Sequence, residues 1–578
     1  YKSIREHLFL NVGGKKKLGE LGLGYGRLYD HISTEPVIHL DPGGRTARGR
    51  WHAIAMFGSY GGFAVWAEGV YEMHYRKVHG VWKIAKLDYY DGFGAPYATG
   101  WAAPPPRPAR PAASKGPMAQ VRRVFRHLAH PPDRPRDHSC DGFPKACIPP
   151  FDYTNPGTTA AGANVWTISE RDVAAVAAAH PGRHASVAER AAELTDRAER
   201  VRDAQQVLNL QRIYGYYLDR AMWDQVADLF ADDGTIEMGQ RGVYVGKRRV
   251  REFLNLLGHD GLTYGWLNDH IQMQPVVDVA PDGKTAWLRG FELDMTGVYH
   301  DWAKWSAGIY ENTYVKQNGV WKFKSLHYYP TFITDYRKGW AKDAEPAPGE
   351  SKRLPPDRPP TEVYSIYPNA FVPPYHYGNP VTGEPQQYPK LGGPTREAIA
   401  ATLEPAHPSF HPQPARNVEQ ALDAAERTVQ RAKDYDELSN LEGAYGYYLD
   451  KFLWRDLADL FTKSGTMELA QRGVYAGRDH IYKFLLDGLG RGQSGPRPNF
   501  LGNHLQLQPE ITLAANGRTA KIRSRVLQQM AFGTRASIGA GVYENQAVKV
   551  DGIWKLSKDH GYNTLGACYK GGWAWGAG

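Results

Sequence analysis

Residues 308–322 read Gly-Ile-Tyr-Glu-Asn-Thr-Tyr-Val-Lys-Gln-Asn-Gly-Val-Trp-Lys, and the pattern recurs at residues 69–83 and 541–555. In each stretch the Glu precedes the Trp by 10 residues, from 72 to 82, from 311 to 321 and from 544 to 554. A Gly-Trp pair closes each copy 19 residues later, ending at Trp101, Trp340 and Trp573. This fixed spacing indicates an internal repeat, which decides the architecture of the chain.

Upstream of this stretch, each copy has a histidine in a short run that precedes a proline and a β-branched segment. The runs are Asp30-His31-Ile32, Asp269-His270-Ile271 and Asn503-His504-Leu505. Turn sequences then separate two strand-like runs in every copy, at Pro42-Gly43-Gly44, Pro281-Asp282-Gly283 and Asn516-Gly517. This is hairpin chemistry, so the shared part of each copy is predicted to be rich in antiparallel strands.

Only the second and third copies have a matching front half. Tyr214-Gly-Tyr-Tyr-Leu-Asp219 parallels Tyr445-Gly-Tyr-Tyr-Leu-Asp450, and apolar residues at helical spacing around these motifs predict two helices that lead into a strand. The first copy begins in its third helix, near residues 4–8. Because a half-domain would expose its core, we expect a segment of roughly half a domain to precede Tyr1.

The segments between the copies are rich in proline and also repeat. Residues 131–135 match residues 355–359, and residues 148–156 match residues 372–380, both 224 positions apart. Tyr, Phe and Ile between the prolines predict straps that lie on domain surfaces, each leading into a charged helix near 187–206 or 418–433. The expected boundaries are copy one at 1–101, a strap at 102–186, helix and copy two at 187–340, a strap at 341–417, and helix and copy three at 418–578.

The composition excludes several classes of protein. The 578 residues include 70 Lys and Arg against 61 Asp and Glu, a net charge of +9, but the basic runs are only three residues long. A nucleic-acid site needs a clustered stripe, so we expect none. No run of about 18 apolar residues exists, so no membrane span is expected. Three cysteines cannot form a disulfide framework, although Cys140 and Cys147 are close enough in sequence either to pair or to remain free thiols. The sequence does not indicate a compartment.

These motifs resemble the SnoaL-like, scytalone-dehydratase-like domains of the nuclear-transport-factor-2-like superfamily. The resemblance covers each copy along its length and rests on Tyr214–Asp219, Asp228–Asp233, Gly242–Gly246, His270 and Gly319–Lys322. It implies an α+β fold of three tandem cone-shaped domains, each with a curved mixed sheet wrapped around helices, the first copy being truncated at its N-terminus. Relatives in this superfamily include dehydratases, dehydrochlorinases, cyclases and isomerases.

The resemblance also implies a site. In dehydratase-like members a Tyr and an Asp from the first helix and a His from a central strand face the cavity, with a second acid on the strand after the His. The matching residues are Tyr214, Asp219, His270 and Asp294 in copy two, and Tyr445, Asp450 and His504 in copy three. Copy three has Gln528 and copy one has Ala55 near the position of Asp294, and copy one keeps only His31. Copy two is therefore predicted to have the most complete site.

The chemistry of these groups gives them a role. A neutral imidazole can abstract a proton beside a carbonyl, a carboxylate can stabilise the imidazolium, and a phenol can hydrogen-bond the oxygen on which charge grows. Such a set is suited to β-elimination or allylic isomerisation of a hydrophobic carbonyl compound, with no metal and no organic cofactor. The sequence contains no phosphate-binding loop, metal-ligand spacing or nucleophile elbow.

Alternatives remain open for each feature. The histidines can be core residues, and Tyr216, Tyr217, Tyr447 and Tyr448 can be packing residues. Glu72, Glu311 and Glu544 are expected to make structural hydrogen bonds. The second hypothesis for function is a non-catalytic ligand-binding protein or scaffold. The copies can self-associate with other chains or fold back as an internal pseudo-trimer.

Overall fold

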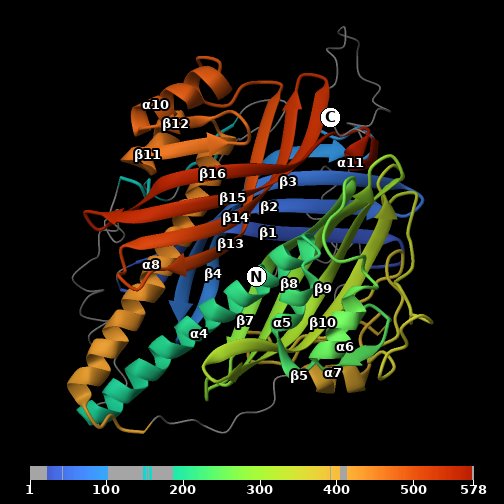
Figure 1. Cartoon of the computed structure of the whole chain (residues 1–578), viewed down its shortest axis with the longest axis horizontal. Helices are drawn as coiled ribbons and strands as arrows, with labels where there is room; N and C mark the ends of the chain where they lie inside the picture. The colour runs from blue at the N-terminus through green and yellow to red at the C-terminus, as the bar shows by residue number, and fades with distance from the viewer. Residues whose placement is uncertain are drawn as a thin grey trace.

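The computed structural model describes residues 22–41, 43–101, 147–151, 153, 155–158, 186–390, 392–403 and 413–575. The expected helix near residues 4–8 and most of the first strap lie outside these residues. The protein is α+β, with three antiparallel-rich sheets, one from each copy (Figure 1). The repeat and the fold class predicted from the sequence are therefore confirmed.

The first copy contributes a four-stranded antiparallel sheet in the order β1-β2-β3-β4. Its strands are β1 (Arg27–Leu40), β2 (Thr46–Ser59), β3 (Phe63–Val78) and β4 (Val81–Pro96). Tight turns join successive strands, as the Gly-rich hairpin signals predict.

The second and third copies have six-stranded sheets with the same topology, β6-β5-β10-β9-β8-β7 and β12-β11-β16-β15-β14-β13, in which the first long strand pairs in parallel with the last. The elements of copy two are α4 (Val187–Asp219), α5 (Trp223–Asp228), β5 (Phe230–Met238), β6 (Val243–Val245), α6 (Lys247–Leu254), β7 (Trp266–Val279), β8 (Thr285–Val298), β9 (Trp302–Gln317) and β10 (Val320–Asp335). Those of copy three are α8 (Val418–Asp450), α9 (Trp454–Asp459), β11 (Phe461–Leu469), β12 (Val474–Ala476), α10 (Arg478–Lys483), the π-helix η2 (Phe484–Leu489), β13 (Phe500–Leu513), β14 (Thr519–Phe532), β15 (Arg535–Val550), β16 (Ile553–Cys568) and α11 (Gly572–Trp575).

The charged helix and the first domain helix, which the sequence suggested as separate elements, form one helix of 33 residues in both copies. Ser186 and Glu189 make a capping box at the start of α4, and Asn417 caps α8. Side-chain oxygens at these positions satisfy backbone N–H groups that have no partner within the helix. Each long helix therefore begins where its strap ends and reaches into its domain.

The three sheets pack around one shared core, with β1, β7 and β13 adjacent at the centre of Figure 1. Aromatic residues from different copies meet there, because Trp66 lies 5.3 Å from Trp305 and 5.1 Å from Trp340 between ring centroids. Buried residues of all three copies form this cluster, among them Ile32, Met56, Ile271, Leu293, Leu505 and Leu527. The chain thus folds back on itself as a three-copy assembly.

Each central strand carries a bulge just before a proline. Glu35, Gln274 and Gln508 have φ angles of 55°, 51° and 56°, and the strand register shifts at each of them. A non-glycine residue in this region is strained unless its surroundings hold it. The bulge pushes one side chain out of the sheet toward the neighbouring copy.

The second strap lies on the outer face of the copy-two sheet and includes α7 (Arg396–Thr402). Arg289 forms an ion pair with Glu311, donates to the carbonyl oxygen of Pro374 at 2.8 Å, and lies 3.7 Å from the ring centroid of Tyr375. The first copy repeats this arrangement with Arg50, Glu72, Pro150 and Phe151. Copy three has the pair Arg523 and Glu544. The structural hydrogen bond expected for the recurring glutamates is confirmed for Glu72 and Glu311, whereas Glu544 forms an exposed ion pair.

The cysteines divide between two states. Cys147 is disulfide-bonded, whereas Cys568 is free and exposed. Cys140 lies outside the described residues. None of the helices in the described part of the chain is long and apolar enough to cross a membrane.

Candidate active site

The second copy contains a cavity of about 510 Å³ with one polar end. This volume lies in the range of small-molecule sites. Most of its wall is apolar or aromatic and comes from the loop that follows α6 and from strands β7 to β10. The wall includes Leu256, Leu257, Trp266, Val298, Trp302 and Ile333. The polar end is formed by His270, Glu292 and Asp294.

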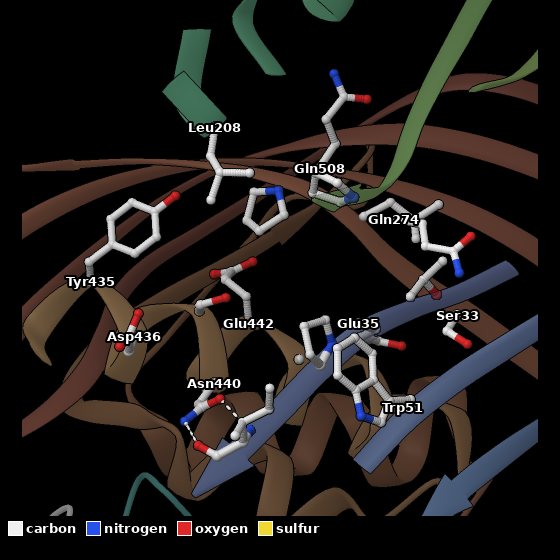
Figure 2. A pocket seen from close by; sticks show the side chains of 18 of the residues that line it. Ser33, Glu35, Trp51, Leu208, Gln274, Tyr435, Asp436, Asn440, Glu442 and Gln508 are labelled. Carbon is white, nitrogen blue, oxygen red and sulfur yellow. Dashed lines mark hydrogen bonds between the residues drawn. The ribbon is translucent and has the colours of Figure 1, made fainter. Parts of the chain in front are cut away.

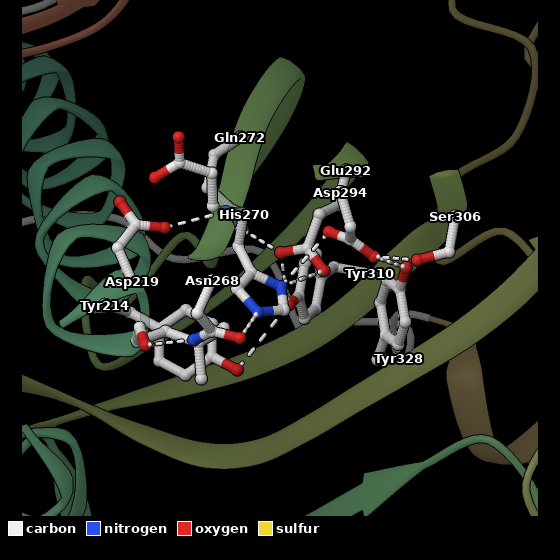
Figure 3. Close-up of polar contacts among 12 residues, drawn as sticks. Tyr214, Asp219, Asn268, His270, Gln272, Glu292, Asp294, Ser306, Tyr310 and Tyr328 are labelled. Carbon is white, nitrogen blue, oxygen red and sulfur yellow. Dashed lines mark hydrogen bonds and ion pairs between the residues drawn. The ribbon is translucent and has the colours of Figure 1, made fainter. Parts of the chain in front are cut away.

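Strand register explains why these three side chains meet. His270 on β7 is directly opposite Asp294 on β8, and Glu292 precedes Asp294 by two residues, so both acids point to the same face. His270 Nδ1 lies 3.1 Å from Asp294 Oδ1 and 3.3 Å from Glu292 Oε1 (Figure 3). One imidazole nitrogen thus faces two buried carboxylates.

The other ring nitrogen has a fixed partner. His270 Nε2 lies 3.2 Å from Asn268 Oδ1, while Asn268 Nδ2 donates to the carbonyl oxygen of Leu218 at 2.9 Å. The Leu218 carbonyl sets the orientation of the amide, so its oxygen faces the ring and Nε2 must be the donor. Both ring nitrogens therefore have acceptors, an arrangement that suits the imidazolium form.

Burial and charge act in opposite directions on His270. Burial lowers its pKa, but the carboxylates of Asp294 and Glu292 outweigh it and raise the pKa to about 10. Burial, reinforced by the neighbouring Asp294, raises the pKa of Glu292 to about 7. At neutral pH the ring is a cation, whereas the sequence led us to expect a neutral imidazole. Glu292, rather than the ring, is the group suited to accept a proton near neutral pH.

Hydrogen bonds hold the two carboxylates in place. Glu292 accepts from Tyr310 at 2.7 Å and also from the Gln272 amide. Asp294 accepts from Ser306 at 2.9 Å and from Tyr328 at 3.2 Å. The rigid supports come from three strands of the same sheet.

Two predicted residues of copy two lie behind the ring rather than in the cavity wall. The Asp219 carboxylate accepts from the backbone N–H of His270 at 2.7 Å and forms an ion pair with Arg525 of copy three. The Tyr214 hydroxyl lies 3.5 Å from that of Tyr310 and is fully buried. The structure brings His270 and Asp294 together, and places Asp219 and Tyr214 where they can position them.

The residues that sequence reasoning missed are Glu292, Asn268, Ser306, Tyr310 and Tyr328. Glu292 could have been found from its alternation with Asp294, since residues two apart on a strand share a face. Tyr310 belongs to the repeated Gly-x-Tyr-Glu motif, which had drawn attention only to its Glu. No sequence signal distinguishes Asn268 or Ser306 from ordinary strand residues.

The third copy brings its predicted residues together differently. The backbone N–H of His504 donates to Asp450, and His504 Nδ1 lies 3.4 Å from the same carboxylate. Tyr445 donates to the buried Asp559 at 3.0 Å instead of approaching the histidine. The register places Gln528 opposite His504 and Val526 opposite Gln506, so the two acids of copy two have no carboxylate counterparts here.

The first copy keeps the histidine alone. His31 is opposite Ala55, and Ala53 occupies the position of Glu292. The His31 Nε2 atom lies 2.7 Å from the Tyr71 hydroxyl, and burial lowers the pKa of the ring. A neutral, hydrogen-bonded histidine is a structural residue of this sheet.

The copy-two cluster also has ligand types that bind metals. One ligand atom from each of His270, Glu292 and Asp294 can be chosen so that all lie within 4.8 Å of one another. Because Asn268 holds Nε2 as a donor, Nδ1 would be the ligand nitrogen, and a metal would have to displace its proton.

With this geometry, the protein falls in the class of α+β repeat proteins, with a cavity at the sheet of its second copy. Residues 14–88, 199–327 and 430–559 match the SnoaL-like domain family, and the chain belongs to that family. No curated protein sequence matches the chain.

Several solved structures are similar to one copy. A protein from Novosphingobium aromaticivorans assigned as a scytalone dehydratase is 24% identical over 24% of this chain and 90% of its own, with a TM-score of 0.21. A hexachlorocyclohexane dehydrochlorinase from Novosphingobium barchaimii is 18% identical over 24% and 92%, with a TM-score of 0.21. An NTF2-like protein with a cystatin-like fold from N. aromaticivorans is 15% identical over 25% and 90%, again with a TM-score of 0.21.

Proposed function

We propose that the second copy is a cofactor-independent lyase or isomerase that acts on a hydrophobic carbonyl compound. The observation that carries this proposal is the position of His270 Nδ1, 3.1 Å and 3.3 Å from two buried carboxylates, in a cavity whose lining is mostly apolar but also includes Arg241. Perturbed acids and bases that converge in an apolar cleft are characteristic of catalytic sites.

The groups divide into a base and an acid. The carboxylate pair removes the proton beside the substrate carbonyl, and the raised pKa of Glu292, about 7, suits a base that works near neutral pH. The His270 cation donates a hydrogen bond or a proton to the oxygen on which charge develops. Tyr214 and Asp219 position this set, Tyr214 through Tyr310 and Asp219 through the backbone of His270.

For an elimination, the electrons of the broken C–H bond form the new C=C bond while the C–O bond breaks. The departing hydroxyl takes a proton from His270 and leaves as water, and the proton on the carboxylate pair restores the ring. For an isomerisation, the same pair returns the proton to another carbon. Neither course needs an oxidant or a reductant.

The wall of the cavity indicates the kind of substrate. Trp266 and Trp302 offer aromatic faces, and Leu256, Leu257 and Ile333 extend the apolar surface. Flat hydrophobic molecules of polyketide, steroid or aromatic type fit such a lining.

A second role fits the other two copies. Ala53 and Ala55 in copy one, and Val526 and Gln528 in copy three, replace the two acids. We propose that these copies act as scaffold, because each supplies contacts that complete a neighbour. On this view the third copy's Tyr445, Asp450 and His504 hold its helix against its sheet.

The test uses β-hydroxy ketones that carry an aromatic ring, with formation of the conjugated enone followed by absorbance. His270→Gln should lower turnover by about 10²-fold or more, the usual effect of losing a general acid or base. Circular dichroism and the melting temperature establish that the variant is folded. His504→Gln is the matched control and should keep most of the activity. Undiminished turnover by folded His270→Gln would refute the proposal, as would loss of activity on dialysis against a chelator.

A further inference from the structure

A groove of about 1220 Å³ lies between the sheets of copies one and two. It is lined by β1, β7, α4 and α8, and Figure 2 shows Gln274 and Leu208 across it from Trp51 and Ser33. Exposed apolar side chains lie along its walls, namely Ile38, Leu40, Leu87, Val201, Val276 and Val429. An apolar surface of this size marks an interaction site.

The other two copies show what lies in the equivalent place. α4 packs on β7 of its own copy and on β13 of copy three, and α8 packs on β13 of its own copy and on β1 of copy one. A helix that followed the same rule for copy one would pack on β1 and on β7. Those two strands are walls of the groove.

The three bulges differ in a way that points to the same occupant. Gln508 is 4% exposed and sits against Gly215 of α4, and Glu35 is 5% exposed and sits against Gly446 of α8. Gln274 has the same backbone conformation but is exposed and lines the groove. Two bulges are covered by a long helix, whereas no helix in the described part of the chain covers the third.

The helix motif supplies a second bond to each covered bulge. Tyr216 donates to the carbonyl oxygen of Gln508 at 2.8 Å, and Tyr447 donates to that of Glu35 at 3.0 Å. In both helices the donor directly follows the glycine that faces the bulge. A Gly-Tyr pair is therefore the feature by which a helix recognises a neighbouring bulge.

We propose that this groove holds a third long helix, the first copy's counterpart of α4 and α8, carried on the same polypeptide. Its glycine lies against Gln274, and the tyrosine that follows donates to the Gln274 carbonyl oxygen. Its apolar face covers Leu40 and Val276.

The proposed third helix should differ from α4 and α8 at one position. Trp51 occupies the position of Gly290 in copy two and of Ser524 in copy three, where the Ser524 hydroxyl donates to Glu442 of α8 at 2.9 Å. The larger indole needs the space that the Glu442 side chain takes in copy three. The third helix accordingly has a small residue at that position.

Binding of a helix can be measured directly. A labelled peptide with the sequence of residues 418–450 and the change Glu442→Ala is added to the 578-residue protein, and fluorescence anisotropy is recorded. We expect saturable binding that weakens at least tenfold in the double variant Leu40→Arg/Val276→Arg. Val474→Arg, which alters an exposed valine of β12 outside the groove, is the matched control and should bind the peptide normally.

Two results would overturn the proposal. The helix site would be refuted if the peptide failed to bind. It would also be refuted if the peptide bound the folded double variant Leu40→Arg/Val276→Arg as tightly as it binds the folded Val474→Arg control. The intact mass of the protein from its natural source tests the same-polypeptide part. It should exceed 64.6 kDa by at least the mass of a helix of about 30 residues, and a mass of 64.6 kDa would exclude that source. Neither result bears on turnover at His270.

Discussion

Arg525 of the third copy forms a buried ion pair with Asp219 at the end of the first helix of the second copy. Both side chains are at most 2% exposed, and a second carboxylate, Asp269, lies 3.4 Å from the same guanidinium. Since Asp219 also accepts from the backbone of His270, this ion pair links the third copy to the candidate site of the second.

Removing that cation should be costly. Arg525→Met leaves the buried carboxylates of Asp219 and Asp269 without the guanidinium cation, so we expect a loss of about 3–5 kcal/mol in the free energy of unfolding, measured by urea denaturation. Adding Asp219→Asn should recover part of the loss. Arg523→Met is the control two residues away, where a 40% exposed side chain pairs with Glu544 and about 0–1 kcal/mol is expected. Equal losses for the two arginines would contradict the importance of burial.

The two carboxylates beside His270 should have separable effects. Asp294→Asn and Glu292→Gln each replace one carboxylate beside Nδ1 by a neutral, non-basic amide, so both should lower turnover by about 10²-fold, the scale of acid and base catalysis. The pH profile of the wild-type enzyme should show a group near pH 7, and Glu292→Gln should abolish that inflection. A profile that keeps the inflection in Glu292→Gln would assign it to another group.

Stability should fall as the pH rises from about 6.5 to 10. The Asp294 and Glu292 carboxylates overcome burial and raise the pKa of His270 to about 10, and Glu68 and Glu35 do the same for His52. The folded protein therefore keeps these protons up to about pH 10, whereas the unfolded chain releases them near 6.5. The contribution of these two protonated histidines to the free energy of unfolding is fully present below pH 6.5 and is lost as the pH passes 10.

The slope of this decline is measurable. It should amount to about 1.4 kcal/mol per pH unit for each retained proton, followed by denaturant unfolding at a series of pH values. His270→Gln and His52→Gln should each flatten the curve. His79→Gln, at an exposed turn, is the control and should leave the slope unchanged.

Gly446→Ala should destabilise the protein, because the contact between copies three and one requires a glycine at this position. A Cβ atom at Gly446 would run into the buried carboxylate of Glu35, which is also bonded to His52 and to the Gln506 backbone. Overpacking of this kind costs about 1–3 kcal/mol, more than the roughly 1 kcal/mol that Ala gains over Gly in a helix. Gly566→Ala, where the added carbon meets open space, should be neutral in thermal unfolding.

The sequence predicts the fold better than the site. The repeat can be recognised from local spacing, whereas the site depends on contacts between residues that are far apart in sequence. Fixed spacings such as Glu311 to Trp321 indicate one domain repeated, and hairpin turns indicate antiparallel strands. Asp294 could be placed because the family resemblance implies a second acid on the strand after the histidine. Asp219, by contrast, has a partner more than 300 positions away in sequence, and no local pattern reveals that Arg525 lies beside it.

The Tyr-Gly-Tyr-Tyr-Leu-Asp motif illustrates the same limit. Its aromatic residues predicted packing, and its first Tyr and its Asp matched the family's cavity residues. In the structure the motif serves two copies at once, because Gly215 and Tyr216 contact the bulge of copy three while Tyr214 faces its own sheet. Which copy a helix residue faces is settled by the assembly of the three domains and not by the spacing of the residues.

The bulge at Glu35 has a consequence for synthesis of the chain. Its carboxyl group contacts His52 of its own sheet and also accepts from the backbone N–H of Gln506 at 3.2 Å, so this second partner is present only when two residues 471 positions apart meet. A ribosome that has released the first sheet must still translate most of the protein before that partner exists. The first sheet therefore lacks this partner during most of translation, and the packing of the three copies is completed only near the end of synthesis.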